Sequence, residues 1–234
     1  MIRIVCVAIL LLLRELREWG YLLRYHYFSL PWIDVAFWYK WTYLWCTPHQ
    51  VARRWMIQNG IPIHHFTHSF TYGETPLRTW DIIIRRTGIQ QGDVVYDIGS
   101  GSGLGCFFLS RRLACSAVGI EQNDDFVWRA EKIRTRLTGC LPWFVHGDAQ
   151  GIDYGPADVV YLFSTTFTHA LYHGLSVRLQ ETLLEGALVI SVSDRMKPES
   201  AFEPIDDFEV PYFFGFCTVY VHRFRGKSRI EASQ

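Results

Sequence analysis

The chain has 234 residues, enough for one α/β domain with an extension but not for two full domains. It contains 23 Lys and Arg residues and 23 Asp and Glu residues, so its net charge gives no reason to expect a nucleic-acid partner. Six scattered cysteines without a C-x-x-C pair argue against a zinc or disulfide framework and are typical of reduced core thiols in an intracellular protein.

The N-terminal segment, residues 1–46, is unusually aromatic. Its apolar run from Ile4 to Leu13 is too short to span a bilayer core, which needs about 20 residues. Charged residues stand where a signal peptide would have its cleavage site. Tyrosine and tryptophan, which favour membrane interfaces, are frequent from Tyr21 to Trp45. Two interpretations remain: a helical segment on a membrane surface, or a helical lid or dimer surface on the domain that follows.

A helix, a loop and a second helix come next. Thr47 and the proline after it predict a helix start, and Asn59 with its following glycine predicts the end. The polar loop His64–Gly73 contains three histidines without an acidic or cysteine partner at ligand spacing, so we expect no metal site there. Apolar residues then recur at helical spacing over the range 77–88.

Strand-like and helix-like segments alternate from residue 94 onward. The predicted strands are Val94–Ile98, Ala117–Glu121, Trp143–Val145, Ala157–Phe163 and Ala187–Val192, and the predicted helices are Leu104–Leu113, Phe126–Leu137 and His169–Leu184. Two further strands, Phe208–Phe214 and Cys217–Phe224, are separated only by a turn at Gly215. This order predicts a Rossmann-like α/β domain over residues 47–234, with a mainly parallel sheet that ends in an antiparallel hairpin.

The clearest motif lies where the first of these strands turns into a helix. It reads Asp97-Ile98-Gly99-Ser100-Gly101-Ser102-Gly103. Glycines allow the backbone to approach a ligand closely, and N–H groups at a helix start favour anionic groups. The nicotinamide fingerprint requires glycine at its sixth place, where this chain has Leu104 or Cys106 in the two registers. A dehydrogenase is therefore disfavoured.

Carboxylates follow three successive strands. Asp97 stands at the carboxyl end of the first predicted strand, Glu121 ends the second, and Asp148 follows the third in the phrase His-Gly-Asp-Ala. An acid at the end of the second strand can accept hydrogen bonds from both hydroxyls of a ribose. Asp148 stands at the right depth to meet an adenine amino group. Three acids in register are a more specific signal than the glycine loop alone, and they indicate an adenosine-containing ligand.

Together these residues resemble the first three motifs of class I S-adenosylmethionine-dependent methyltransferases. That resemblance implies a seven-stranded sheet with a reversed terminal hairpin, and S-adenosylmethionine as cofactor. Over Phe66–Asp194, the element Tyr72-Gly73-Glu74-Thr75 makes the chain similar to the non-SET lysine methyltransferases of the nucleosome core. Their relatives include membrane-linked mitochondrial lysine methyltransferases with a hydrophobic segment before the catalytic domain. The cofactor-binding residues implied are Glu74, Thr75, Asp97, Gly99, Ser100, Gly101, Gly103, Glu121, Gln122, Asp148 and Ala149.

The acceptor side departs from that family. After the fourth strand the lysine enzymes have an asparagine-containing element, whereas this chain reads Ser-Thr-Thr-Phe from Ser164 to Phe167. Phe167 can form a wall beside the sulfonium, and the hydroxyls of Ser164 and Thr165 partly replace the amide. With Tyr72 and Glu74 these are the predicted catalytic residues. Three functions stay open: lysine N-methylation on a membrane or membrane-adjacent protein, methyl transfer to a small or lipidic acceptor, and a non-catalytic cofactor-binding scaffold.

Overall fold

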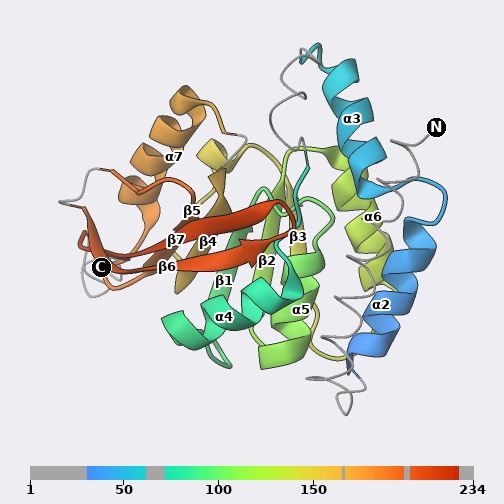
Figure 1. Ribbon diagram of the computed structural model, residues 1–234, viewed down its shortest axis with the longest axis horizontal. Helices are drawn as coiled ribbons and strands as arrows, with labels where there is room; N and C mark the ends of the chain where they lie inside the picture. Colours follow the sequence, from blue (N-terminus) through green and yellow to red (C-terminus); the bar gives the residue numbers. More distant parts are fainter. Residues whose placement is uncertain (1–30, 62–71, 165–166, 198–200, 227–234) are drawn as a thin grey trace.

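The computed structural model describes residues 31–61, 72–164, 167–197 and 201–226. In these ranges the strands form one seven-stranded sheet in the order β3-β2-β1-β4-β5-β7-β6 (Figure 1). The predictions for the apolar run Ile4–Leu13, the histidines of the 64–68 stretch and Thr165 lie outside the described residues. The strands are β1 (Val94–Ile98), β2 (Ser116–Glu121), β3 (Trp143–His146), β4 (Val159–Phe163), β5 (Leu188–Val192), β6 (Phe202–Tyr212) and β7 (Gly215–Phe224).

The predicted sheet topology is confirmed. β1 pairs in parallel with β2 and β4, β2 with β3, and β4 with β5, whereas β7 runs antiparallel to both β5 and β6. The register places Ile98 beside Ile120, and Glu121 beside His146. Because parallel strands end at the same edge of a sheet, the residues that follow β1, β2 and β3 gather at one edge.

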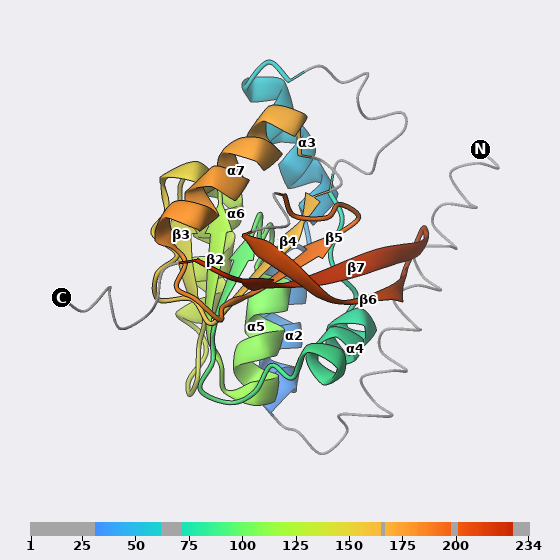
Figure 2. The ribbon, with the colours of Figure 1, turned by 90° about the vertical axis from the view of Figure 1, so that its left-hand side faces the viewer.

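Helices cover both faces of the sheet, as Figures 1 and 2 show for α7 on one side and α4 and α5 on the other. On one face, Val95 and Ala117 of the strands pack with Trp80 of α4 and Phe107 of α5. The opposite face packs against α7. The described helices are α2 (Pro31–Thr42), α3 (Pro48–Gln58), α4 (Leu77–Thr87), α5 (Leu104–Leu113), α6 (Asp124–Arg134), the 3₁₀ helix η2 (Ala149–Gly151) and α7 (His169–Thr182).

β6 begins earlier than the sequence predicts. We expected a strand over Phe208–Phe214, but the observed strand covers Phe202–Tyr212, so the predicted start is wrong by six residues. Its first half contains Pro204 and two aspartates, and the register shifts between Pro204 and Asp206. Proline and acidic residues are tolerated on an edge strand because one side of that strand makes no backbone hydrogen bonds to a neighbouring strand. These residues hide the alternation of apolar and polar side chains by which a strand is predicted.

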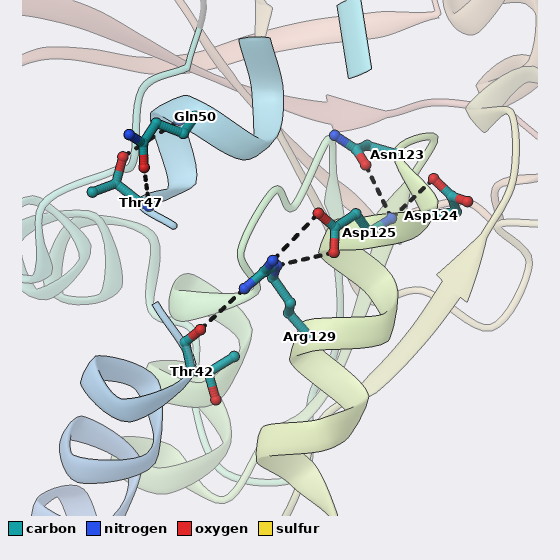
Figure 3. Close-up of polar contacts among 7 residues, drawn as sticks. All are labelled: Thr42, Thr47, Gln50, Asn123, Asp124, Asp125 and Arg129. Carbon is teal, nitrogen blue, oxygen red and sulfur yellow. Dashed lines mark hydrogen bonds and ion pairs between the residues drawn. The ribbon is translucent and has the colours of Figure 1, made fainter. Parts of the chain in front are cut away.

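Helix α2 belongs to the predicted N-terminal segment and packs against α5 and α6. Its buried face contains Val35, Tyr39 and, just beyond its end, Tyr43, which join the main hydrophobic core. Arg129 on α6 donates to the carbonyl oxygen of Thr42 at 3.0 Å and pairs with Asp125 at 3.0 Å (Figure 3). The division of the chain at residue 46 stays a prediction. These contacts join α2, which precedes residue 46, to α5 and α6, which follow it.

The start of α3 is confirmed. The Thr47 hydroxyl accepts from the backbone N–H of Gln50, and the Gln50 side chain accepts from the backbone N–H of Thr47, which makes a capping box (Figure 3). The prediction of core cysteines holds for Cys46, Cys106 and Cys115, which are buried. It is wrong for Cys140, which is exposed because it lies in the loop before β3, and Cys217 is half-buried.

Candidate functional site

The glycine loop bends tightly between β1 and α5. Gly99, Gly101 and Gly103 all have positive φ, at 74°, 52° and 77°. A side chain at Gly99 would meet the ring of Phe167 at 3.8 Å, and one at Gly101 would meet the ring of Tyr72 at 2.7 Å. The two predicted aromatic site residues therefore lie directly against the loop, from segments far apart in the sequence.

Replacing Gly101 with alanine should damage both stability and cofactor binding. Positive φ costs a non-glycine residue about 1–2 kcal/mol, and the new methyl group would also displace Tyr72. Gly60 is the matched control, because its φ is 67° and no atom of the described residues lies within 4 Å of its substitution site. We expect Gly60→Ala to show only the backbone cost in urea unfolding. Gly101→Ala should unfold more easily than Gly60→Ala and weaken S-adenosylhomocysteine binding by about tenfold or more. Equal behaviour of the two variants would contradict the contact with Tyr72.

Glu121 ends β2 and is fixed by backbone N–H groups. Its Oε2 accepts from Gly101 N at 2.8 Å, and its Oε1 accepts from Asn123 N at 2.8 Å. Burial raises the pKa of Glu121, and the backbone donors of Asn123, Gly101 and Gln122 act in the opposite direction. The carboxylate is thus held in one orientation, which suits an acceptor for two neighbouring hydroxyls.

Asp97 is the most strongly perturbed of the predicted acids. Its side chain is buried, and the Cys106 thiol donates to Oδ2 at 3.6 Å. Burial raises the pKa of Asp97 to about 7, although the Cys106 hydrogen bond lowers it, and the nearby Glu121 carboxylate raises it further. A buried carboxyl of this kind favours a cationic ligand, because the positive charge of the ligand would stabilise the ionised carboxylate that burial disfavours.

The third acid has a partly structural task. Asp148 is exposed, and its Oδ1 accepts from Gln150 N at 3.0 Å, which caps η2. Ala149 begins that short helix and is half-buried, and Gln122 is exposed directly after Glu121. The structure therefore brings Asp148 to the same sheet edge as Asp97 and Glu121, at its solvent-facing end.

Glu74 lies at the centre of a cluster of hydroxyl groups. Its Oε1 accepts from Tyr72 Oη at 2.7 Å, from Ser102 Oγ at 2.5 Å and from the Tyr39 hydroxyl. The Tyr72 hydroxyl also accepts from Ser102 N at 3.2 Å, inside the glycine loop. Burial raises the pKa of Tyr72 well above its usual range, and the Glu74 carboxylate raises it further. The tyrosine is therefore a hydrogen-bond donor at neutral pH, and Glu74 is anchored to the loop.

Thr75 belongs to a second hydroxyl cluster. Its Oγ1 lies 2.6 Å from the hydroxyl of Tyr161 and 3.4 Å from that of Tyr212, and the two tyrosine hydroxyls are 3.1 Å apart. Tyr212 stacks on Phe163 with ring centroids 4.8 Å apart. This arrangement fixes Thr75 against β4 and β6. It also places the aromatic rings of Phe163 and Tyr212 beside the segment that holds Glu74.

On the predicted acceptor side, Ser164 is buried and its hydroxyl is already engaged. It lies 2.8 Å from the Val192 carbonyl oxygen and 3.1 Å from Asp194 Oδ2, both of which accept hydrogen bonds. The ring of Phe167 lies against Gly99, and its role as a wall of the site stays a prediction. Thr165, the other predicted hydroxyl, lies outside the described residues. The role of Ser164 as a replacement for the missing amide stays a prediction.

Sequence reasoning missed several polar residues of the site. Tyr39 and Tyr212 come from segments with no recognisable motif, and only the position of Ser102 within the glycine loop could have indicated a role. The side-chain atoms Ser100 Oγ and Asn123 Nδ2 are buried without a hydrogen-bond partner among the described residues. Both flank the loop and Glu121. An adenosyl ligand fits this edge because the carboxylates of Asp97 and Glu121 can accept hydrogen bonds from its amino and hydroxyl groups.

Comparison with known proteins gives one family match. The model described as "Histone methylation protein DOT1" matches residues 63–209. A curated relative, the sterol 24-C-methyltransferase of Eremothecium gossypii, is 26% identical over 130 residues, which cover 53% of this chain and 35% of that protein. The chain therefore spans only about a third of the length of this relative.

Solved structures with a similar fold are numerous. An RNA methyltransferase from Salinibacter ruber in complex with S-adenosyl-L-homocysteine has a TM-score of 0.55 and 27% identity, over 64% of this chain and 93% of that chain. TrmN from Thermus thermophilus has a TM-score of 0.54 and 15% identity, over 62% and 48% of the two chains. The magnesium protoporphyrin IX methyltransferase of Synechocystis, with bound S-adenosylhomocysteine, has a TM-score of 0.51 and 13% identity, over 64% and 82%. At such identities the last two show the fold alone.

Proposed function

Because this chain belongs to the histone methylation protein DOT1 family and is a class I S-adenosylmethionine-dependent methyltransferase, we propose that it methylates a lysine side chain of a protein. The observation that supports a protein acceptor is the family match over residues 63–209. This range includes the Tyr72–Thr75 element, whose Glu74 binds the glycine loop through Ser102. Family membership also favours an enzyme over the non-catalytic scaffold.

The cofactor is S-adenosylmethionine, and its binding residues are part of the proposal. We assign the ribose to Glu121, the adenine to Asp148 and Ala149, and the cationic end to Asp97 and Glu74. The cofactor supplies a methyl group already activated on a positively charged sulfur. The remaining residues proposed for the binding site are Thr75, Gly99, Ser100, Gly101, Gly103 and Gln122.

The chain's own residues have to align the acceptor and exclude water. A lysine amine has a reference pKa near 10.4 and must lose a proton to solvent before it reacts. Apolar surroundings promote that loss because they disfavour the charged form. Phe167 and the stacked pair Phe163 and Tyr212 supply such surroundings beside the glycine loop and Thr75. Asp97, Glu74 and Glu121 would hold the cofactor, which would supply its activated methyl group to the neutral nitrogen.

A second candidate acceptor is RNA or a small or lipidic molecule. The relatives named above include an RNA methyltransferase and a sterol methyltransferase, and Ser164 stands where the lysine enzymes have asparagine. Incubation of the full chain and a host lysate with methyl-tritiated S-adenosylmethionine separates the candidates. We expect label in protein, on methyllysine after acid hydrolysis. Label confined to RNA, or to material extracted by organic solvent, would contradict the lysine assignment.

We also propose that the N-terminal segment binds the surface of an anionic membrane. Within the described ranges, no helix has the length and apolarity required to cross a bilayer. Large apolar side chains are nevertheless exposed at helical spacing on α2 and just beyond it, opposite the buried face of that helix. They are Ile33, Phe37, Trp41, Leu44 and Trp45. Lys40, Arg53 and Arg54 are exposed on α2 and α3 and add positive charge. Exposed aromatic side chains on a helix, with basic side chains on the same and the next helix, are typical of interfacial binding.

Vesicle flotation tests this membrane proposal. We expect the full chain to float with vesicles that contain phosphatidylglycerol, and less with pure phosphatidylcholine. Replacing Phe37 and Trp41 together with serine should reduce the bound fraction by about tenfold or more, because two large apolar groups no longer enter the interface. Phe216→Ser is the control, since Phe216 is even more exposed than Phe37 and Trp41 but lies on β7. A double variant that floats like the unaltered chain would contradict the role of α2.

A further inference from the structure

The hydroxyl cluster around Glu74 draws on a helix outside the family match. Tyr39 belongs to α2 (Pro31–Thr42), whereas the match begins at residue 63. The Tyr39 hydroxyl donates to Glu74 Oε1 and lies 3.0 Å from Ser102 Oγ. Tyr39 therefore connects α2 with both the Tyr-Gly-Glu-Thr element and the glycine loop. We infer that Tyr39 is a positioning residue, which orients the Glu74 carboxylate toward the amino group of the cofactor's methionine end.

The position of Tyr39 is fixed from both ends of its helix. Near the start of α2, Arg111 of α5 pairs with Asp34 at 2.9 Å. At its end, Arg129 of α6 donates to the Thr42 carbonyl oxygen and pairs with Asp125, as Figure 3 shows. Helix α2 is thereby held against α5 and α6, and Tyr39 faces into the core between these contacts. A side chain held in this way can direct a hydrogen bond with little further loss of conformational entropy.

The charge state of Tyr39 is suited to this role. Burial, and then the Glu74 carboxylate, raise its pKa well above the usual range, so the hydroxyl keeps its proton and donates. Three hydroxyl donors, from Tyr39, Tyr72 and Ser102, meet at one carboxylate oxygen. Hydrogen bonds to a charged group are the stronger kind, and they favour one orientation of the carboxylate. The inference rests on the proposed cofactor role of Glu74.

Tyr39→Phe removes the hydroxyl and keeps the ring, and a matched control lies one helical turn away. The Tyr43 ring centroid is 4.8 Å from that of Tyr39, and its buried hydroxyl has no hydrogen-bond partner among the described residues. We expect Tyr39→Phe to raise the Kd of S-adenosylhomocysteine, measured by calorimetry on the full chain, by about tenfold. KM for S-adenosylmethionine should rise by a similar factor, while kcat stays within about twofold. Tyr43→Phe should change none of these.

A second ligand separates positioning from a general structural effect. 5′-Methylthioadenosine keeps the nucleoside but lacks the amino acid end. Tyr39→Phe should change its Kd by less than about twofold, because the interaction worth about tenfold is made only at the amino end. Ser102→Ala removes another donor to Glu74 and a contact of Tyr39 without a substitution in α2, and it should give the same pattern. The inference is overturned if Tyr39→Phe leaves S-adenosylhomocysteine binding unchanged, or weakens both ligands equally.

Glu74→Gln distinguishes this inference from the proposal on which it rests. If Glu74→Gln weakens S-adenosylhomocysteine but Tyr39→Phe does not, Glu74 binds the cofactor and only the role of Tyr39 is wrong. If Glu74→Gln binds S-adenosylhomocysteine as the unaltered chain does, both the cofactor role of Glu74 and the positioning role of Tyr39 are wrong.

Discussion

Glu121→Ala should weaken S-adenosylmethionine binding by at least about 100-fold. Each hydrogen bond from a ribose hydroxyl to a charged acceptor contributes about 1.5–3 kcal/mol, so the loss of two gives at least this factor. The carboxylate is preset for the task, since Gly101 N and Asn123 N already hold both of its oxygens at 2.8 Å. Isothermal calorimetry of the full chain measures the effect directly.

Two further variants show whether the loss of affinity in Glu121→Ala is caused by lost contacts to the ligand. Glu131→Ala removes a carboxylate from α6 whose partner is Arg134, three residues away on the same helix. Such a helical pair contributes only about 0.3–0.5 kcal/mol, so we expect unchanged affinity. Glu121→Gln keeps an acceptor oxygen but loses the charge, and its affinity should lie between those of the unaltered chain and Glu121→Ala. If Glu121→Ala retains its affinity, the assignment of the ribose to β2 is wrong.

Asp97→Asn should stabilise the ligand-free protein and weaken the cofactor by about tenfold to 100-fold. The pKa of Asp97 is about 7 in the folded chain and near 3.8 ordinarily, chiefly because of burial. Between these values the folded state keeps a proton that the unfolded chain releases. The contribution of the Asp97 carboxyl to the free energy of unfolding is therefore fully present below about pH 4, and it is lost as the pH rises to about 7. Urea unfolding should show a larger gain from Asp97→Asn at pH 8 than at pH 5.

The same linkage predicts a pH-dependent affinity. A cationic ligand prefers the ionised carboxylate, so binding releases a proton from Asp97 below pH 7 and the affinity rises with pH. At pH 6, one unit below the pKa of about 7, only about one molecule in eleven is ionised, which makes binding about tenfold weaker than at pH 8. Asp97→Asn should lack this component of the profile. An unaltered chain with the same affinity at pH 6 and pH 8 would contradict a buried carboxyl at the cationic end.

The sheet could be predicted from the sequence where local pattern decides the structure. β1, β4 and β5 are short apolar runs between turn residues, and the Gly99–Gly103 loop needs the positive φ angles that glycine allows. The three acids were predicted at one sheet edge because parallel strands end together, and the register agrees with this. The start of β6 at Phe202 could not be predicted, since edge-strand polarity hides the alternation there.

The contacts of Glu74 could not be predicted because they depend on packing between distant segments. Tyr39 and Glu74 are 35 positions apart, and no spacing rule connects α2 to the Tyr-Gly-Glu-Thr element. The composition of the aromatic N-terminal segment predicts only a membrane-binding segment or a helical lid or dimer surface. In the structure one side of α2 carries Phe37 and Trp41 outward, and the other carries Tyr39 into the core. Composition alone does not reveal which aromatic residue takes which side.

A crystal structure of the full chain with S-adenosylhomocysteine tests the central claim most directly. We expect both ribose hydroxyls on the Glu121 carboxylate, the adenine beside Asp148, and the amino group between Asp97 and Glu74. A nucleoside bound elsewhere, with Glu121 making no contact to the ribose, would contradict it.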